Sequence, residues 1–180
     1  MRSHLLEKGL VTVYTGAGRG KTTAALGLAL RVLGWGGRVC MIQFIKGYSE
    51  IGEVRFADQY GDRFEIRQFA IDLSPSIRQA DVLQRREAAE LALSYAETAI
   101  SGGDYDLVIL DEINNALHYD LISTQAVLAI VKGRPAHVEL VLTGRDAPPE
   151  IIEAADYVTE MLHTKHPFQK GIPARRGVDY

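Results

Sequence analysis

The feature that most constrains this chain is a glycine-rich loop between an apolar strand pattern and a helical pattern. Residues 14–23 read Tyr-Thr-Gly-Ala-Gly-Arg-Gly-Lys-Thr-Thr, after the run Leu-Val-Thr-Val and before an apolar helical pattern. Glycines let several backbone N–H groups approach one anion, and the positive end of the new helix points at the same anion. Lys21 adds a positive charge, and the hydroxyl of Thr22 is a ligand for Mg²⁺. We therefore expect the loop to bind a nucleoside triphosphate.

One position of the loop departs from the usual P-loop pattern, G-x-x-x-x-G-K-[ST]. Counting back from Gly20 puts the first glycine of that pattern at position 15, which is Thr15. The loop is therefore a variant P-loop.

The 180 residues read as one domain, 1–180, with no internal repeat and no linker. Strand patterns at 10–15, 38–45, 64–69, 106–111, 138–142 and 157–162 alternate with helical patterns at 21–33, 77–101, 113–119, 123–132 and 148–154. Several of the strands are nearly continuous apolar runs, which is typical of strands buried on both faces. We predict an α/β fold: a mainly parallel sheet sandwiched by helices, as in RecA-like P-loop NTPases.

A second nucleotide-site motif lies at residues 107–112, an apolar strand that ends in Asp111 and Glu112. Carboxylates at this place reach the Mg²⁺ that a triphosphate holds. Alternatively, the two acidic residues only stabilise the start of the short helix that begins at Ile113. In combination with the loop, the pair favours a P-loop protein that binds Mg-nucleotide.

Other candidates at the site are weaker. Thr143 and Arg145 follow the next buried strand, where they can contact the terminal phosphate, or form an ordinary surface turn. Arg31, ten residues after Lys21, either reaches the nucleotide or is solvated. His118 is interpreted as a surface or core residue. No nucleophilic triad and no His/Cys metal spacing is apparent, so the residues alone do not identify the reaction.

Charge and composition exclude some classes of protein. The net charge is −3 and the basic residues are scattered, which argues against a nucleic-acid partner. No apolar run approaches about 18 residues, so we expect no membrane span. The N-terminal residues lack a long apolar signal core, and Cys40, the only cysteine, lies in an apolar run as a small buried hydrophobe would. We expect a cytoplasmic protein.

The chain resembles the P-loop ATP:corrinoid adenosyltransferases of cobalamin synthesis and salvage. The resemblance runs nearly end to end and in order. It is carried by residues 15–25, 34–36, 43–47, 52–53, 111–112, 143–145, 154–156, 158–161, 165–168 and 177–180.

The resemblance implies an alkyl transfer. A corrinoid reduced to Co(I) attacks the 5′ carbon of ATP, and inorganic triphosphate leaves. The family holds ATP in a reversed sense, with the γ-phosphate where an ordinary P-loop holds an inner one, and the variant loop led by Thr15 agrees with this. The resemblance also implies Mg²⁺ or Mn²⁺, an electron-donating reductase such as a flavoprotein, and a homodimer.

The site residues follow from the motifs together with this resemblance. Lys21 and Glu112 are the candidate catalytic residues, and Thr22, Asp111 and Glu112 the candidate metal ligands. The candidate ATP-binding residues are Gly16, Ala17, Gly18, Arg19, Gly20, Lys21, Thr22, Thr23, Arg31, Thr143 and Arg145.

The corrinoid side departs from the family pattern. Known members place a Phe-x-Trp pair before the long middle helix, where it packs on the corrin and helps to displace its lower axial ligand. The corresponding positions here are Ile71 and Leu73, with Phe69 close by. Either apolar bulk suffices, or Phe69 acts in a shifted register, or the corrinoid is handled differently. Two other functions therefore stay open: an ATPase or small-molecule kinase, and a non-catalytic ATP or corrinoid binder.

Overall fold

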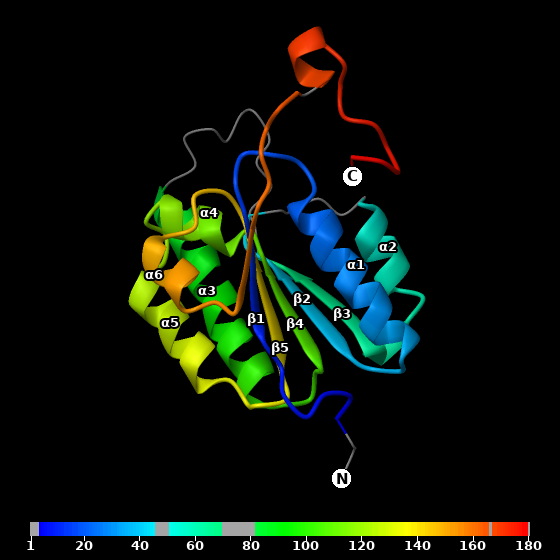
Figure 1. The fold of residues 1–180 in the computed structure, drawn as a ribbon, viewed down its shortest axis with the longest axis vertical. Helices are drawn as coiled ribbons and strands as arrows, with labels where there is room; N and C mark the ends of the chain where they lie inside the picture. The colour runs from blue at the N-terminus through cyan, green and yellow to red at the C-terminus, as the bar shows by residue number, and fades with distance from the viewer. Residues whose placement is uncertain (1–3, 46–50, 70–81, 166, 180) are drawn as a thin grey trace.

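A six-stranded parallel sheet forms the centre of the molecule (Figure 1). The computed structural model describes residues 4–45, 51–69, 82–165 and 167–179. The strands lie in the order β3-β2-β4-β5-β1-β6, and every neighbouring pair is parallel. Their bounds are β1 Val11–Thr15, β2 Val39–Gln43, β3 Phe64–Gln68, β4 Leu107–Asp111, β5 Glu139–Thr143 and β6 Tyr157–Glu160.

Helices cover both faces of the sheet. One face carries α1 (Lys21–Gly34) and α2 (Gly52–Ala57), and the other carries α3 (Val82–Ser101), α4 (Ile113–His118), α5 (Thr124–Gly133) and α6 (Pro149–Glu153) (Figure 1). Short 3-10 helices span Gly61–Arg63 and Pro167–Lys170. The fold class predicted from the sequence is confirmed. None of the helices in the described ranges is long and apolar enough to cross a membrane.

Alternate residues of each central strand supply the two halves of the core. In β4, Val108 and Leu110 pack under α3 and α5, whereas Leu107 and Ile109 pack under α1. Side chains of a strand alternate between the faces, so continuous apolar runs are needed where both faces are covered. The same burial explains Cys40, whose thiol is fully buried in β2 with a pKa raised to about 12 by burial.

The observed element bounds differ from the expected ones in few places. The sequence pattern missed α2, which has only six residues and begins at Gly52, too short for a helical period to be recognised. Strand β2 ends two residues early, at Gln43, and β6 ends at Glu160. The expected start of the long helix, 77–81, lies outside the described residues.

At the end of the sheet opposite the glycine loop, two carboxylates accept hydrogen bonds from backbone N–H groups. Asp106, fully buried, accepts hydrogen bonds from the backbone N–H of Leu5 and of Arg38, both at 2.8 Å. Glu139 accepts one from the N–H of Leu10 at 2.7 Å. These bonds fix the chain where the strands begin.

Glu139 makes stability depend on pH. Burial raises the pKa of this carboxyl, and the Leu10 N–H offsets the effect only in part. When the pKa of a group is higher in the folded than in the unfolded state, the group's contribution to stability is fully present below the unfolded pKa. This contribution is lost as the pH rises through the folded pKa. Glu139→Gln keeps an acceptor oxygen, so we expect it to raise the melting temperature relative to wild type more at pH 8 than at pH 5. Melting curves by circular dichroism at both pH values check this, and a difference independent of pH would contradict it.

Candidate functional site

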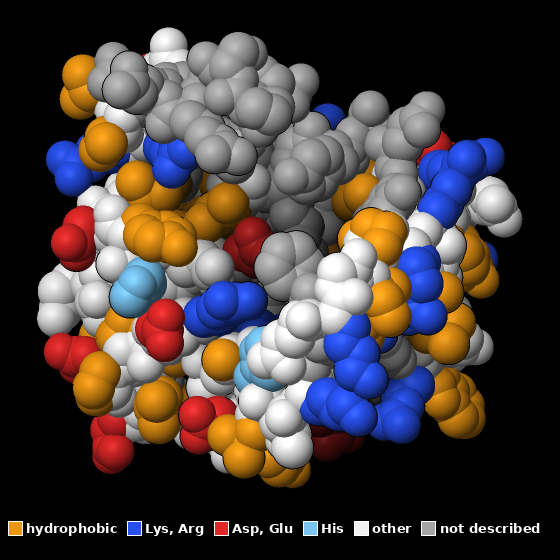
Figure 2. Space-filling view, turned by 90° about the horizontal axis from the view of Figure 1, so that it is seen from above, with side chains coloured by type: hydrophobic (Ala, Val, Ile, Leu, Met, Phe, Trp, Pro, Cys, Tyr) orange, Lys and Arg blue, Asp and Glu red, His pale blue; other side chains and the backbone are white. Residues whose placement is uncertain are grey.

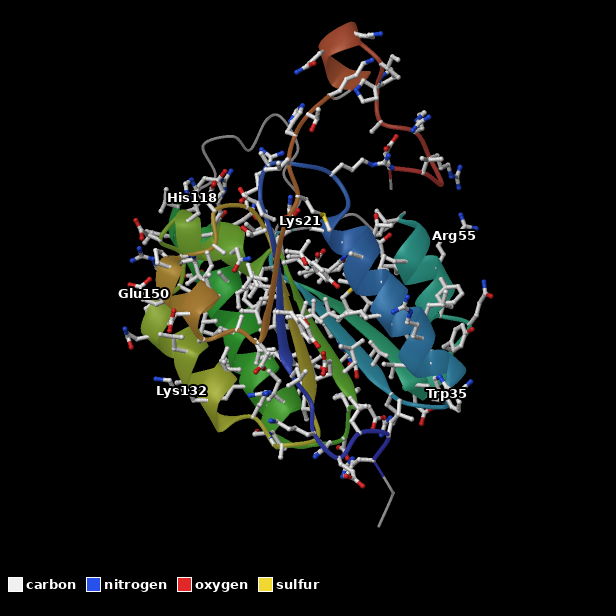
Figure 3. The ribbon with its side chains drawn as sticks, in the orientation of Figure 1. Lys21, Trp35, Arg55, His118, Lys132 and Glu150 are labelled. Carbon is white, nitrogen blue, oxygen red and sulfur yellow. The ribbon has the colours of Figure 1, made fainter. Side chains whose placement is uncertain are left out.

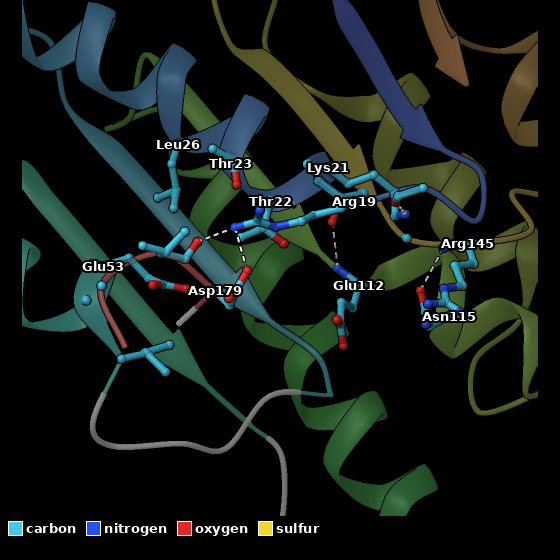
Figure 4. Close-up of a pocket in the computed structure, with 18 residues that line it drawn as sticks. Arg19, Lys21, Thr22, Thr23, Leu26, Glu53, Glu112, Asn115, Arg145 and Asp179 are labelled. Atoms are coloured by element: carbon cyan, nitrogen blue, oxygen red, sulfur yellow. Dashed lines mark hydrogen bonds and ion pairs between the residues drawn. The ribbon is translucent and has the colours of Figure 1, made fainter. Parts of the chain in front are cut away.

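A pocket of about 510 Å³ opens at the edge of the sheet where the parallel strands end. It is lined by residues 18–23 and 26, 51–53, 112 and 115, 143–145, and 177–179 (Figure 4). The loop after β1, the turn after β4 and the turn after β5 thus meet at one edge, as the strand pattern predicted. Figure 2 shows the molecule from above, with Lys and Arg side chains interspersed with acidic and hydrophobic ones. Arg19, Lys21 and Arg145 line the pocket itself, which suits an anionic ligand.

Two glycines of the loop are required because residues 161–162, which follow β6, lie directly against it. A Cβ on Gly16 would come within 2.6 Å of the Met161 carbonyl oxygen, and one on Gly18 within 2.6 Å of the carbonyls of Met161 and Leu162. The N–H of Gly18 donates to the Met161 carbonyl at 2.6 Å. Gly20, at φ 114, directly precedes α1 in a left-handed conformation that favours glycine. The loop backbone is therefore held against the chain that leaves β6, and the start of α1 opens toward the pocket.

A methyl group on Gly18 is expected to disturb this arrangement. Gly18→Ala forces the side chain into two carbonyl oxygens and should cost about 1–3 kcal/mol of stability, as overpacking does. Gly27→Ala is the matched control, because nothing lies within 4 Å of its Cβ position in α1. This control should gain up to about 1 kcal/mol from helix propensity. Urea unfolding measures both, and equal stabilities of the two variants would refute the account of the loop.

Lys21 is bound to the loop itself. Its Nζ donates to the carbonyls of Gly16 at 2.6 Å and Gly18 at 2.7 Å (the residue is labelled in Figure 3). Burial lowers the pKa of this ammonium, and the charge of Arg145 lowers it further. An anion in the pocket would offset both effects, so the site is electrostatically prepared for one.

Asp111 joins three elements beneath the pocket. It is fully buried, and its Oδ1 accepts hydrogen bonds from the hydroxyls of Thr22 at 2.9 Å and Thr143 at 2.7 Å. The Thr143 hydroxyl in turn accepts one from the backbone N–H of Glu112 at 2.9 Å (Figure 4). The carboxylate at the end of β4 thus fixes the start of α1 and the end of β5. It does not itself line the pocket.

The polar network extends to Gln43, which the sequence analysis did not single out for the site. Gln43 is fully buried at the end of β2, opposite Gln68 of β3 and Asp111 of β4 in the sheet register. Its Oε1 accepts from Gln68 Nε2 at 2.8 Å, and its Nε2 lies 3.4 Å from both Asp111 Oδ2 and Glu53 Oε1. Its position in the sequence could have indicated this role, because Gln43, like Asp111 and Thr143, is a polar residue that ends a buried strand.

Glu112 has a conformation that non-glycine residues seldom adopt. Its φ is 63°, and it directly precedes α4 without making a side-chain capping hydrogen bond. Its side chain instead lines the pocket (Figure 4). Such local strain persists where neighbouring groups fix the backbone, and it is concentrated at functional sites. A role of Glu112 at a bound nucleotide, rather than only at the start of α4, stays a prediction.

The oxygen atoms at this place fit a magnesium ion bound to phosphate. Thr22 and Asp111 are hydrogen-bonded to each other, and Glu112 follows Asp111 in sequence and borders the same pocket as Thr22. Within the ranges that the structure describes, no group of three or more His, Cys, Asp or Glu could hold a metal. Mg²⁺ commonly takes one or two protein oxygens and completes its shell with waters and substrate phosphates, so a short donor set is sufficient.

The candidate arginines differ in where they lie. Arg145 follows Gly144, borders the pocket, and its backbone N–H donates to Asn115 Oδ1 at 2.8 Å (Figure 4). Arg19 also borders the pocket. Arg31 lies exposed in the last turn of α1, outside the pocket lining and about 15 Å along the helix from Lys21. Its contact with nucleotide stays a prediction.

The corrinoid candidates are only partly described. Phe69 follows β3 and is half-buried, with its ring centroid 5.5 Å from that of Tyr95. Ile71 and Leu73 lie outside the described residues. His118 is exposed and lies 3.7 Å from the carboxylate of Asp146, outside the pocket lining. Of the two interpretations from the sequence, surface or core, the structure shows the first.

Comparison with known proteins gives a consistent result. The family model described as ATP:corrinoid adenosyltransferase BtuR/CobO/CobP matches residues 7–180. A corrinoid adenosyltransferase of Pseudomonas aeruginosa is 38% identical over 176 residues, covering 97% of this chain and 85% of the relative. The corrinoid adenosyltransferase of Escherichia coli K12 is 34% identical over 174 residues, covering 97% and 87%. One from Sinorhizobium is 39% identical over 178 residues, covering 97% and 81%.

Solved structures share the fold at low sequence identity. The flagellar accessory protein FlaH from Methanocaldococcus jannaschii superposes with a TM-score of 0.57 at 13% identity, over 84% of this chain and 70% of that one. The genome packaging NTPase B204 of Sulfolobus turreted icosahedral virus 2, in complex with AMP, gives 0.50 at 15% identity, over 89% and 78%. These likenesses support the P-loop NTPase fold.

Proposed function

Because the chain belongs to the ATP:corrinoid adenosyltransferase family, we propose that its pocket at the sheet edge binds ATP for adenosyl transfer to a reduced corrinoid. The protein is an enzyme that transfers the adenosyl group of ATP to a corrinoid. The observation that carries the assignment of the site is the meeting of the glycine loop, Glu112 and residues 143–145 in one pocket. The alternatives of an ATPase, a kinase or a non-catalytic binder lose their support.

The reaction requires that negative charge be stabilised on a leaving group. Two electrons of Co(I) form the Co–C5′ bond, and the electrons of the C5′–O bond leave with triphosphate. Lys21 would stabilise the negative charge of the leaving triphosphate. Its ammonium would replace its hydrogen bonds to two loop carbonyls with hydrogen bonds to phosphate oxygens. The backbone N–H groups at the start of α1 and the guanidinium of Arg145 would share the charge.

The remaining candidate residues would hold the metal and the ribose. Thr22, Asp111 and Glu112 would hold Mg²⁺, or Mn²⁺, which when bound neutralises part of the triphosphate charge. Glu112 would also face the ribose. No side chain is needed as a nucleophile, because the substrate cobalt supplies it. The chain's task is to orient C5′ and to exclude water.

The reversed placement of ATP is also part of the proposal. Thr15, where the usual pattern has glycine, is buried, and its hydroxyl accepts a hydrogen bond from the backbone N–H of Ala147 at 3.1 Å. The side chain thus supports the segment after β5, and the loop begins one residue later, at Gly16. A shortened loop is consistent with the γ-phosphate lying where an ordinary P-loop holds an inner one.

A homodimer, an electron-donating reductase such as a flavoprotein, and a cytoplasmic location complete the proposal. The dimer and the reductase rest on the family resemblance, and the location rests on the N-terminal composition and the single cysteine. The edge strand β6 is exposed along its whole length and carries the exposed apolar side chains of Tyr157 and Val158, which is compatible with a protein partner.

A spectroscopic assay tests the proposed function. Under anaerobic conditions the protein is mixed with Mg-ATP and chemically reduced cobalamin, and the absorbance is followed for a Co–C product that light destroys. We expect the product only when ATP and protein are both present. Consumption of ATP without a light-sensitive product would overturn the proposal.

A further inference from the structure

The C-terminal part of the chain returns to the mouth of the pocket. After β6 the chain rises away from the sheet through the 3-10 helix Pro167–Lys170 and comes back beside the top of α1 (Figure 1). Residues 177–179 then form one wall of the pocket. We call residues 175–179 the C-terminal strap.

One arginine of the glycine loop binds the strap. Arg19 Nη2 lies 2.7 Å from Asp179 Oδ1 and also donates a hydrogen bond to the carbonyl of Val178 (Figure 4). The pair connects the phosphate loop to a segment near the other end of the chain. Both side chains are partly exposed, so the connection can open in water.

The strap is a compact turn that keeps Asp179 ionised. The carboxylate accepts from the backbone N–H of Arg175 at 2.9 Å and from its guanidinium at 3.1 Å, and the N–H of Asp179 donates to the Arg175 carbonyl at 2.8 Å. The bonds from Arg175 hold the pKa of Asp179 below its usual range. Gly177, at φ 76, permits the reversal.

Arg19 can hold the strap and a phosphate at once. A guanidinium has five N–H donors, and the contacts of Arg19 with Val178 and Asp179 both use one nitrogen, Nη2. Arg19 lines the same pocket as Lys21, whose Nζ binds the carbonyls of Gly16 and Gly18.

We propose that residues 175–179 are a closing strap on the nucleotide pocket, tied to the phosphate loop by the Arg19–Asp179 ion pair, with Asp179 as a positioning residue that slows the escape of bound nucleotide. This inference rests on the proposed function of the pocket. It adds a part of the chain, and a residue, that the nucleotide motifs do not include.

The test measures how fast nucleotide leaves. A fluorescent ATP analogue is bound with Mg²⁺ and displaced by excess ATP in a stopped-flow instrument. Because an exposed ion pair contributes little, Asp179→Asn should raise the dissociation rate modestly, by about two- to fivefold. A chain ending at Ala174 should raise both association and dissociation rates, the latter about tenfold. Asp179→Glu should restore a rate close to wild type.

Two controls distinguish an effect of the strap on the dissociation rate from an effect of any lost surface charge. Asp58→Asn makes the same chemical change at an exposed position at the end of α2 and should leave the rate unchanged. Raising the salt concentration should bring the wild-type rate toward that of Asp179→Asn, since exposed charges are screened. If the analogue binds but neither Asp179→Asn nor the shortened chain changes its release, the strap is refuted while the pocket assignment stands. If the wild-type protein binds no analogue, both fail.

Discussion

Lys21→Ala is expected to lower kcat/KM for adenosyl transfer about 10³-fold. The ammonium is half-buried among loop carbonyls, and no other lysine borders the pocket within the described chain. Loss of a preorganised group that stabilises developing charge commonly costs about 10²–10³ in rate, and the loss here is of a full charge. Steady-state kinetics with reduced cobalamin, followed by absorbance, measure the effect.

Two controls accompany this substitution. Lys132→Ala removes an exposed lysine from α5, at the far end of the molecule from the pocket, and should leave the rate unchanged (Figure 3). The thermal unfolding of Lys21→Ala should stay close to wild type, because the lost hydrogen bonds lie at the surface of the pocket. A variant that retains activity within threefold of wild type would show that the site is assigned wrongly.

Asp111→Asn is expected to raise the Mg²⁺ concentration needed for half-maximal activity about 10- to 100-fold. The carboxylate holds the hydroxyls of Thr22 and Thr143, and groups that orient metal ligands typically contribute this much to metal affinity. An amide has the same shape but lacks the charge, and one of its two heavy atoms donates instead of accepting. Titration of turnover with Mg²⁺ at saturating ATP measures the shift.

Asp106→Asn is the matched control for this prediction. Asp106 is just as buried, at the opposite end of the sheet, where it binds backbone N–H groups of Leu5 and Arg38. Its substitution should lower the melting temperature without changing the Mg²⁺ dependence. An unchanged Mg²⁺ dependence in Asp111→Asn would remove this residue from the proposed metal site.

The strands and the edge at which they meet could be predicted from the sequence. Continuous apolar runs such as β4 leave little choice but a strand buried on both faces, and a polar residue at the end of such a run marks the ligand edge. Helix α2 could not be predicted, because six residues contain less than two helical turns.

The parts of the site that the sequence did not predict depend on contacts between distant segments. Gly16 and Gly18 were interpreted as phosphate-binding residues, yet their lack of a side chain is also required by the carbonyls of residues 161–162. Gln43 enters the site through its register with Asp111. The bond between Arg19 and the strap joins segments whose approach no local pattern encodes.

Identification of the phosphorus products tests the central claim most directly. Phosphorus NMR of a reaction with Mg-ATP and reduced cobalamin should show inorganic triphosphate in the same amount as the light-sensitive Co–C product, since attack at C5′ releases the three phosphates together. ADP or inorganic phosphate as the initial product, in place of triphosphate, would contradict attack at C5′ in this pocket.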